Sequence, residues 1–166
     1  MQAASHTNAP TSAGTSNTDR IEREVRLQVP RSRVWNAIAD SQQFGKWFGM
    51  QLDEPFVAGA TAHGRMTVKG YEHLTVELAI DRVEPEHLFS FRWHPYAIDP
   101  DADYSNEPMT LITFTLDPIE GGTLLRVVES GFDRIPASRR VKAFEMDSRG
   151  WEGQLRNITK YLATQD

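Results

Sequence analysis

The sequence has no cysteine among its 166 residues, so it can form neither a disulfide bond nor a thiolate nucleophile. It contains no apolar run close to the ~20 residues that cross a bilayer. Basic residues are fewer than acidic ones, 18 against 23, and the net charge of −5 repels nucleic acid and anionic membranes. There is no H-E-x-x-H pair, G-x-S-x-G elbow or glycine-rich phosphate loop. We therefore identify no catalytic residue and expect no metal, no cofactor and no nucleic-acid partner.

Hydrophobic residues make up 39% of the chain and charged residues 25%, which is typical of one globular domain. The first 18 residues are almost all small or polar, without the basic start or apolar segment of a secretory signal. With no large apolar side chain after Met1, this segment cannot offset the entropy of ordering it. We expect residues 1–20 to be a disordered tail, residues 21–166 to form one domain, and the protein to be cytoplasmic.

The last part of the chain, from about Pro136 to Leu162, has the pattern of one long amphipathic helix. Its apolar seam repeats at steps of three and four residues, which keeps the seam on one helix face. The seam consists of Val141, Phe144, Ser148, Trp151, Leu155, Ile158 and Leu162. Such a helix extends about 40 Å. It needs a broad partner surface, and a curved sheet is the natural candidate.

The sequence from Ile21 to Phe48, at the other end of the expected domain, predicts a strand followed by two short helices. Alternation from Ile21 to Val29 indicates the strand, and Pro30 ends it. An N-cap at Asp40 or Ser41 separates the two helices. Their apolar residues are Val34, Trp35 and Ile38 in the first helix and Phe44, Trp47 and Phe48 in the second.

Short alternating segments between residues 61 and 130 predict an antiparallel meander, because the intervals are too short for crossover helices. Lys69-Gly70 marks a hairpin turn, and the pattern breaks at Asp81-Arg82 as at a β-bulge. The last strand, residues 123–130, is apolar on both faces, so its inward side is not assigned. The fold class is therefore α+β with a helix-grip arrangement. A curved antiparallel sheet of about six to seven strands wraps around the long C-terminal helix, with two short helices after the first strand.

Five segments resemble the bacterial SRPBCC proteins, which are START-like and of the birch-pollen-allergen type: VWNAIAD, FGKWFG, LFSFRWHP, GGTLLRVVESGF and RGWEGQLRNITKYL. Within that superfamily, the similarity is to bacterial relatives of the C-terminal domain of the heat-shock-protein-90 ATPase activator. The resemblance covers residues 21–163. It implies a helix-grip fold with a cavity between the long helix and the sheet. It also implies binding of a hydrophobic small molecule or lipid, although some members are enzymes or chaperone cofactors.

Large side chains on the faces expected to point inward form the candidate site. A helix-grip fold brings the second short helix, the sheet and the long helix together around Trp47, Phe48, Met66 and Trp151, where a ligand pocket could form. The simpler interpretation of each aromatic residue is core packing. The candidate ligand-cavity residues are Trp47, Phe48, Met66, Leu78, Phe91, Trp93, Phe114, Phe144, Ser148, Trp151 and Leu155.

Small residues interrupt the long helix around Trp151. Ser148 breaks the apolar seam, and each of Gly150 and Gly153 costs ~1 kcal/mol relative to alanine within a helix. These residues either let the helix pass close over the sheet or bend it, or they leave room for a ligand. We therefore place the candidate site between Ser148 and Gly153.

Polar residues give weaker hypotheses. Most charges on strands face solvent, although three of them could be polar groups inside a cavity: Glu77, Arg92 and Glu129. His94 could enter the mouth of the cavity, although a surface position at a strand end is the expected one. The Asp99–Asp103 loop is expected to be a solvated acidic loop, because it lacks the later ligands of a calcium loop. A solvated face is expected for the basic residues near the start of the long helix, which are Arg134, Arg139, Arg140 and Lys142.

The sequence therefore predicts a module that binds a hydrophobic small molecule or lipid in a cavity between the long helix and the sheet. Two alternatives remain. Converging ionisable side chains would favour an enzyme that acts on an apolar substrate in that cavity. A large exposed apolar patch would favour a co-chaperone-like protein-interaction module. The sequence specifies neither the ligand nor the oligomeric state, nor whether a chaperone is bound.

Overall fold

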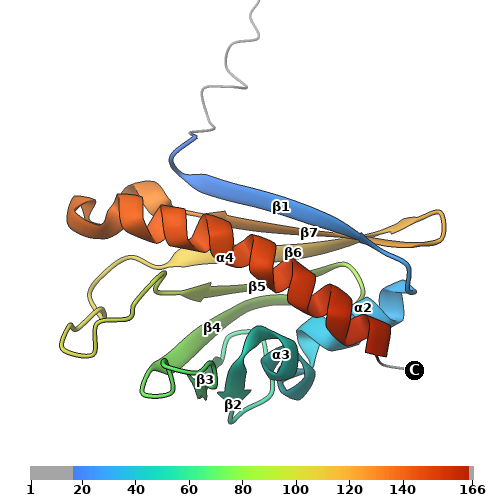
Figure 1. The fold of residues 1–166 in the computed structure, drawn as a ribbon, viewed down its shortest axis with the longest axis horizontal. Helices are drawn as coiled ribbons and strands as arrows, with labels where there is room; N and C mark the ends of the chain where they lie inside the picture. Colours follow the sequence, from blue (N-terminus) through green and yellow to red (C-terminus); the bar gives the residue numbers. More distant parts are fainter. Residues whose placement is uncertain (1–16, 165–166) are drawn as a thin grey trace, which may run out of the picture.

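The long C-terminal helix α4 (Ala137–Thr164) lies across one face of a seven-stranded antiparallel sheet, in the computed structural model that describes residues 17–164 (Figure 1). The strands are β1 (Arg20–Leu27), β2 (Met50–Leu52), β3 (Thr61–Met66), β4 (Thr75–Glu84), β5 (Leu88–Trp93), β6 (Thr110–Ile119) and β7 (Gly122–Ser130). Their order in the sheet is β1-β7-β6-β5-β4-β3-β2. The predicted helix-grip fold is confirmed.

Two short helices, α2 (Arg31–Ala39) and α3 (Ser41–Phe48), follow β1 as predicted. Asp40 stands between them, and its carboxylate accepts hydrogen bonds from the backbone N–H groups of Gln42 and Gln43 at 2.9 and 3.4 Å. These bonds satisfy two of the free N–H groups of the first turn, so the N-cap is Asp40. A 3₁₀ helix, η1 (Phe132–Arg134), leads from β7 toward α4.

The sheet connects the two ends of the domain through β1 and β7. These strands pair along their whole length, from Arg20 opposite Ser130 to Leu27 opposite Thr123. The predicted irregularity near Asp81 is confirmed, because the pairing of β4 with β5 shifts register between Ile80 and Arg82.

The structure assigns the inward side of β7, which the sequence left open. Thr123, Leu125, Val127 and Glu129 are buried and alternate with half-buried residues. Arg126 lies on the outer side, where its guanidinium forms ion pairs with glutamates of β1. Because strand side chains alternate between the two faces, the outward Arg126 requires Glu129 to point inward, into the core.

The seam of α4 is shifted in its first half relative to the prediction. Val141 was expected to pack and is 73% exposed, whereas Ala143 is fully buried. In this half α4 meets η1, with the Phe144 and Phe132 rings 5.2 Å apart, so a different helix face is covered. The buried residues of the helix are Ala143, Trp151, Leu155, Ile158 and Leu162.

The glycines of α4 do not serve a close approach to the sheet. Gly150 is exposed, and a Cβ atom added to it would meet nothing within 4 Å. A Cβ atom at Gly153 would meet only the end of the Arg156 side chain, at 3.7 Å. The interpretation of these glycines as contact points with the sheet is therefore wrong. None of the described helices is long and apolar enough to span a membrane.

Candidate functional site

Five of the predicted ligand-cavity residues form one aromatic cluster beneath α4: Phe48 of α3, Phe91 and Trp93 of β5, Phe114 of β6 and Trp151 of α4. The Trp151 ring lies 5.7 Å from Phe114, 5.8 Å from Phe48 and 6.0 Å from Trp93, measured between centroids. Trp93 is half-buried, whereas the other four are buried. The sequence thus identified side chains that do meet in space, from four different elements.

The remaining predicted residues lie around this cluster or away from it. Trp47 is buried, and its indole N–H donates to the carbonyl oxygen of Ala37 at 2.8 Å. Met66 is half-buried opposite Met50, at the sheet edge formed by β2 and β3. The other members are the buried Leu78 and Leu155 and the half-buried Phe144 and Ser148. That these residues line a ligand cavity stays a prediction.

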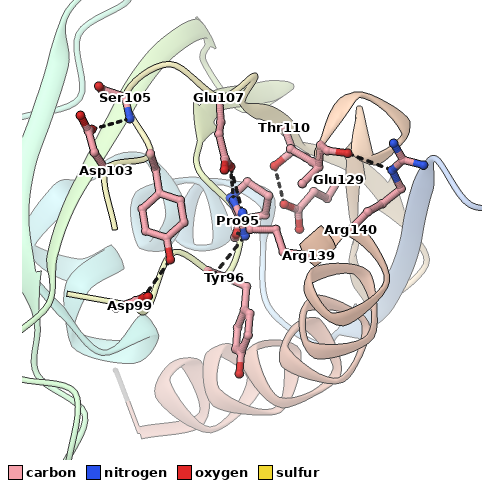
Figure 2. A network of polar contacts seen from close by, with 12 residues as sticks. Pro95, Tyr96, Asp99, Asp103, Ser105, Glu107, Thr110, Glu129, Arg139 and Arg140 are labelled. Atoms are coloured by element: carbon pink, nitrogen blue, oxygen red, sulfur yellow. Dashed lines mark hydrogen bonds and ion pairs between the residues drawn. The ribbon is translucent and has the colours of Figure 1, made fainter. Parts of the chain in front are cut away.

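Glu129 is a fully buried carboxylate at one end of the aromatic cluster. Its Oε2 atom accepts hydrogen bonds from Trp93 Nε1 at 2.8 Å and from Thr110 Oγ1 at 2.6 Å. Its Oε1 atom accepts from Trp151 Nε1 at 2.8 Å. Both oxygens of Glu129 therefore act as hydrogen-bond acceptors, from three donors that converge on them. Figure 2 shows Thr110 and Glu129 side by side.

Asp147 lies one helical turn before Trp151, and its Oδ2 atom is buried without a hydrogen-bond partner in the described protein. Burial raises the pKa of this carboxyl well above its ordinary value. The charge of Glu129 and a hydrogen bond shared with Glu129 raise the pKa further, while Arg139 acts in the opposite direction. Asp147 therefore keeps its proton at pH values where an exposed aspartate has lost it.

Arg139 fastens the β5–β6 loop, residues 94–109, to the first turns of α4 (Figure 2). Its Nε and Nη2 atoms lie 2.9 and 2.8 Å from Glu107 Oε1, and its Nη1 atom donates to the carbonyl oxygen of Pro95 at 2.7 Å. Its guanidinium carbon is 4.7 Å from the ring centroid of Tyr104. The expectation of a solvated Arg139 is wrong, because only 17% of its side chain is exposed.

His94 is the first residue of the same loop. It is half-buried, whereas the sequence had suggested a position at the surface. Its Nδ1 atom is buried and has no hydrogen-bond partner in the described protein. Burial lowers the pKa of His94, and the charges of Glu107 and Glu77 raise it while that of Arg139 lowers it. The ring is therefore neutral over more of the physiological range than an exposed histidine.

These side chains form one polar cluster: His94, Glu107, Glu129, Arg139 and Asp147. Buried polar atoms are nearly always hydrogen-bonded, so each exception needs an explanation. Here three buried atoms without a hydrogen-bond partner, His94 Nδ1, Asp147 Oδ2 and Arg139 Nη2, lie in a cluster that adjoins the aromatic cluster. Of these, Arg139 Nη2 contacts Glu107 as an ion pair at 2.8 Å. The atoms on His94 and Asp147 therefore have unused hydrogen-bonding capacity.

The acidic loop, residues 99–103, belongs to the same β5–β6 connection. The Asp99 and Asp103 carboxylates accept hydrogen bonds from the backbone N–H groups of Asp101 and Ser105 at 2.9 and 3.0 Å, so they stabilise turns. Within residues 17–164, no group of three or more His, Asp or Glu side chains could hold a metal ion.

A separate groove of about 380 Å³ lies between β1 and α4. The ion pair of Arg23 Nε with Glu152 Oε2, at 3.2 Å, lies within its walls. The lining residues are Arg23, Glu24, Val25, Glu152, Leu155, Arg156, Thr159 and Lys160. Of the predicted ligand-cavity residues only Leu155 lines this groove, so the groove and the aromatic cluster are different surfaces.

We expect Asp147→Asn to be more stable than the wild type at neutral pH, by about 1 kcal/mol, because the amide cannot ionise beside Glu129. The folded protein binds the Asp147 proton more tightly than the unfolded chain does. The free energy of unfolding of the wild type therefore falls as pH rises above the ordinary value of 3.8.

Thermal unfolding at a series of pH values measures this effect as the difference in Tm between variant and wild type. The difference should grow with pH. Glu145→Gln removes an exposed carboxylate two residues away and serves as the control. A Tm difference between Asp147→Asn and the wild type that stays constant with pH would contradict a raised pKa for Asp147 in the folded protein.

The chain matches one protein-family model, and its fold is similar to that of several solved structures. The family model described as "Activator of Hsp90 ATPase homolog 1-like protein" matches residues 28–163. Protein MLL2253 from Mesorhizobium loti has 22% identity and a TM-score of 0.70, with 89% of this chain and 98% of that chain covered. A protein from Arthrobacter aurescens has 17% identity and a TM-score of 0.73, with 91% of each chain covered.

DynU16, a protein of the dynemicin biosynthetic locus, has 24% identity and a TM-score of 0.65. The match covers 88% of this chain but only 48% of DynU16, so the chain spans about half the length of that relative. At these identities the likeness shows the fold alone. No curated protein matches the sequence.

Proposed function

The chain belongs to the family of activator of Hsp90 ATPase homolog 1-like proteins, and on this premise we propose that it binds a hydrophobic small molecule or lipid. The site lies where the aromatic cluster meets the polar cluster, between the β5–β6 loop and the first half of α4. The apolar part of the ligand contacts Trp93 and Trp151, and its polar group contacts Asp147 and His94.

One observation carries the proposal. Three buried polar atoms at the end of an aromatic core have no hydrogen-bond partner, and two of them, on Asp147 and His94, have no ion-pair partner either. A polar group of a ligand that bonds to these atoms offsets the cost of burying them, about 1–3 kcal/mol for each unsatisfied group. Ligand sites are commonly mostly apolar with a few polar groups that fix orientation, and this region has that composition.

The tryptophans of the chain provide a direct test, because each indole N–H gives its own NMR signal. We expect the neutral probe N-phenyl-1-naphthylamine to shift the indole signals of Trp93 and Trp151, whose N–H groups point to Glu129. Trp35 of α2 is the internal control, and its signal should stay unchanged. Native mass spectrometry of the purified protein would additionally detect a co-purified ligand.

A variant pair sharpens this test. Ser148 is half-buried on α4 beside Asp147, so Ser148→Leu should fill space at the site and weaken probe binding at least tenfold without unfolding the protein. Arg149→Leu introduces the same leucine side chain at an exposed neighbouring position, and this variant should bind the probe as the wild type does. Probe-induced shifts confined to the groove, for example at Val25 and Thr159, would contradict the proposed site.

The same carboxyl pair favours a second candidate, an enzyme that transfers protons to or from an apolar substrate. A protonated Asp147 beside Glu129 places a carboxylic acid next to a second carboxyl group, and such pairs can divide the roles of acid and base between them. Recovery of a co-purified molecule together with its isomer, in proportions that change with incubation, would support catalysis. An unchanged molecule would support binding alone.

A further inference from the structure

The charges around the polar cluster do not balance. Glu129 on β7 and Asp147 on α4 lie side by side, and the nearest cation, Arg139, forms an ion pair with Glu107 at 2.8 Å. The partners of the Glu129 carboxylate in the described structure are two indole N–H groups, one hydroxyl and the Asp147 carboxyl group, and none of them is a cation. A fully buried carboxylate without a cationic partner is costly, because a charge in the interior is stabilised by pairing.

The other charged groups near the cluster do not correct this imbalance. The β5–β6 loop contributes Glu107 and His94, and β4 contributes Glu77, whose charge acts on His94. His94 is disfavoured as a cation by its burial. With Arg139 offset by Glu107, the remaining charge around Glu129 is negative, and protonation of Asp147 limits it only in part.

Aromatic rings surround the same carboxyl groups. Trp93 and Trp151 stack with their ring planes 29° apart, and Phe48 lies 5.8 Å from each of them. The faces of tryptophan rings attract cations, and more strongly where water is excluded. Carboxylates together with aromatic faces are the chemistry that recognises an organic ammonium group.

We propose that the ligand of this site is an amine, an apolar molecule whose ammonium group lies between Trp93, Trp151 and the carboxyl groups of Glu129 and Asp147. This inference rests on the proposed function and names its ligand class. The ammonium group donates hydrogen bonds to Asp147 Oδ2 and to His94 Nδ1, the two acceptors among the three atoms without a hydrogen-bond partner; the third, Arg139 Nη2, stays in its ion pair with Glu107. The proton of Asp147 passes to solvent when the cation binds, so the site exchanges one positive charge for another.

Other head groups fit less well. A carboxylate or phosphate would add a negative charge beside Glu129, which opposes binding. An alcohol could bond to Asp147 and His94, but it would leave the charge of Glu129 uncompensated. The order of affinity should therefore be amine, then alcohol, then acid.

Three naphthalene derivatives of matched size test this order: 2-naphthylmethylamine, 2-naphthylmethanol and 2-naphthoic acid. Isothermal titration should give an affinity for the amine on the order of tenfold tighter than for the alcohol, about 1.4 kcal/mol, with the acid weakest. Titration in two buffers of different ionisation enthalpy should show proton release with the amine and none with the alcohol. Affinity for the amine should rise as pH rises through the raised pKa of Asp147, above its ordinary value of 3.8, because ionised Asp147 favours the cation.

Two variants separate charge from shape. Asp147→Asn keeps the side-chain volume, so it should lower amine affinity about tenfold to the level of the alcohol and abolish proton release, with alcohol affinity unchanged. Glu145→Gln, an exposed neighbour, should change neither affinity. Circular dichroism confirms that both variants are folded.

The outcomes distinguish this inference from the proposed function. Equal affinity for amine and alcohol, or tighter binding of the acid, together with shifts of the Trp93 and Trp151 indole signals, would overturn the amine inference and leave the proposed site intact. Shifts of neither signal with all three compounds would overturn both.

Discussion

Glu129→Gln is expected to lower the free energy of unfolding by on the order of 3 kcal/mol, although the substitution changes only one atom of the side chain. The two oxygens of Glu129 accept from donors on opposite sides, Trp151 on one and Trp93 with Thr110 on the other. A glutamine amide has one acceptor oxygen and one donor NH₂ group. Whichever way the amide is turned, its NH₂ group faces a buried donor.

Chemical denaturation of the variant measures this loss, with Glu120→Gln as a control at an exposed position, where the expected change is within 0.5 kcal/mol. Trp151→Phe completes a double-mutant cycle, because it removes the donor that an amide NH₂ would face. The double variant should be destabilised by less than the sum of the two single variants. Additive effects, or a Glu129→Gln variant as stable as the control, would show that the hydrogen bonds to Glu129 contribute little.

Arg139→Ala is expected to have the second large effect, a loss of about 2–3 kcal/mol that is concentrated in the β5–β6 loop. Without the guanidinium, Glu107 loses its ion pair, Pro95 loses a donor to its carbonyl oxygen, and the ring of Tyr104 loses its cation. The pair is not fully buried, because 17% of the Arg139 and 22% of the Glu107 side chain are exposed, so the expected loss is smaller than for a dry pair.

Amide hydrogen exchange localises this effect. Protection should fall in residues 95–107 and stay close to wild type in β6 and β7. Arg140→Ala is the matched control on the same helix, since Arg140 makes one hydrogen bond, from its Nε atom to the carbonyl oxygen of Ile135 at 2.9 Å. The loss of amide protection in Arg139→Lys should lie between the losses in Arg139→Ala and Arg140→Ala. A lysine ammonium group keeps the charge but cannot form the paired hydrogen bonds of a planar guanidinium. Uniform loss of protection across the sheet would contradict a local role.

Periodicity predicted the fold because each element has one apolar face over most of its length. The seam of α4 was correct from Trp151 to Leu162, where the sheet, α2 and α3 cover it. It failed at Val141, because that part of the helix is covered by η1 and a loop, whose position a helical pattern does not encode. Apolar patterns indicate that a face is covered, but not which irregular segment covers it.

The polar cluster was largely missed for a related reason. Glu129 was considered as a possible polar group inside a cavity. The strand around it is apolar on both faces, so the sequence did not show which face points inward. Arg126 could have shown which face of the strand points inward. A charged side chain on a strand usually faces outward, and Glu129, three residues later, then lies on the opposite, inward face. Asp147 and Arg139 lie on a helix where charges usually face solvent, so only the folded structure reveals their burial.

The pairing of the first strand with the last has a consequence for how the chain is made. At about 5–20 residues per second, β1 leaves the ribosome many seconds before its partner β7 has been synthesised. During this interval β1 has no partner strand, and such a strand is open to wrong pairing with other chains. Its outward residues, Arg20, Glu22, Glu24 and Arg26, are all charged, which keeps the waiting strand soluble. The order of the strands thus makes completion of the sheet a late event in the synthesis of this part of the chain.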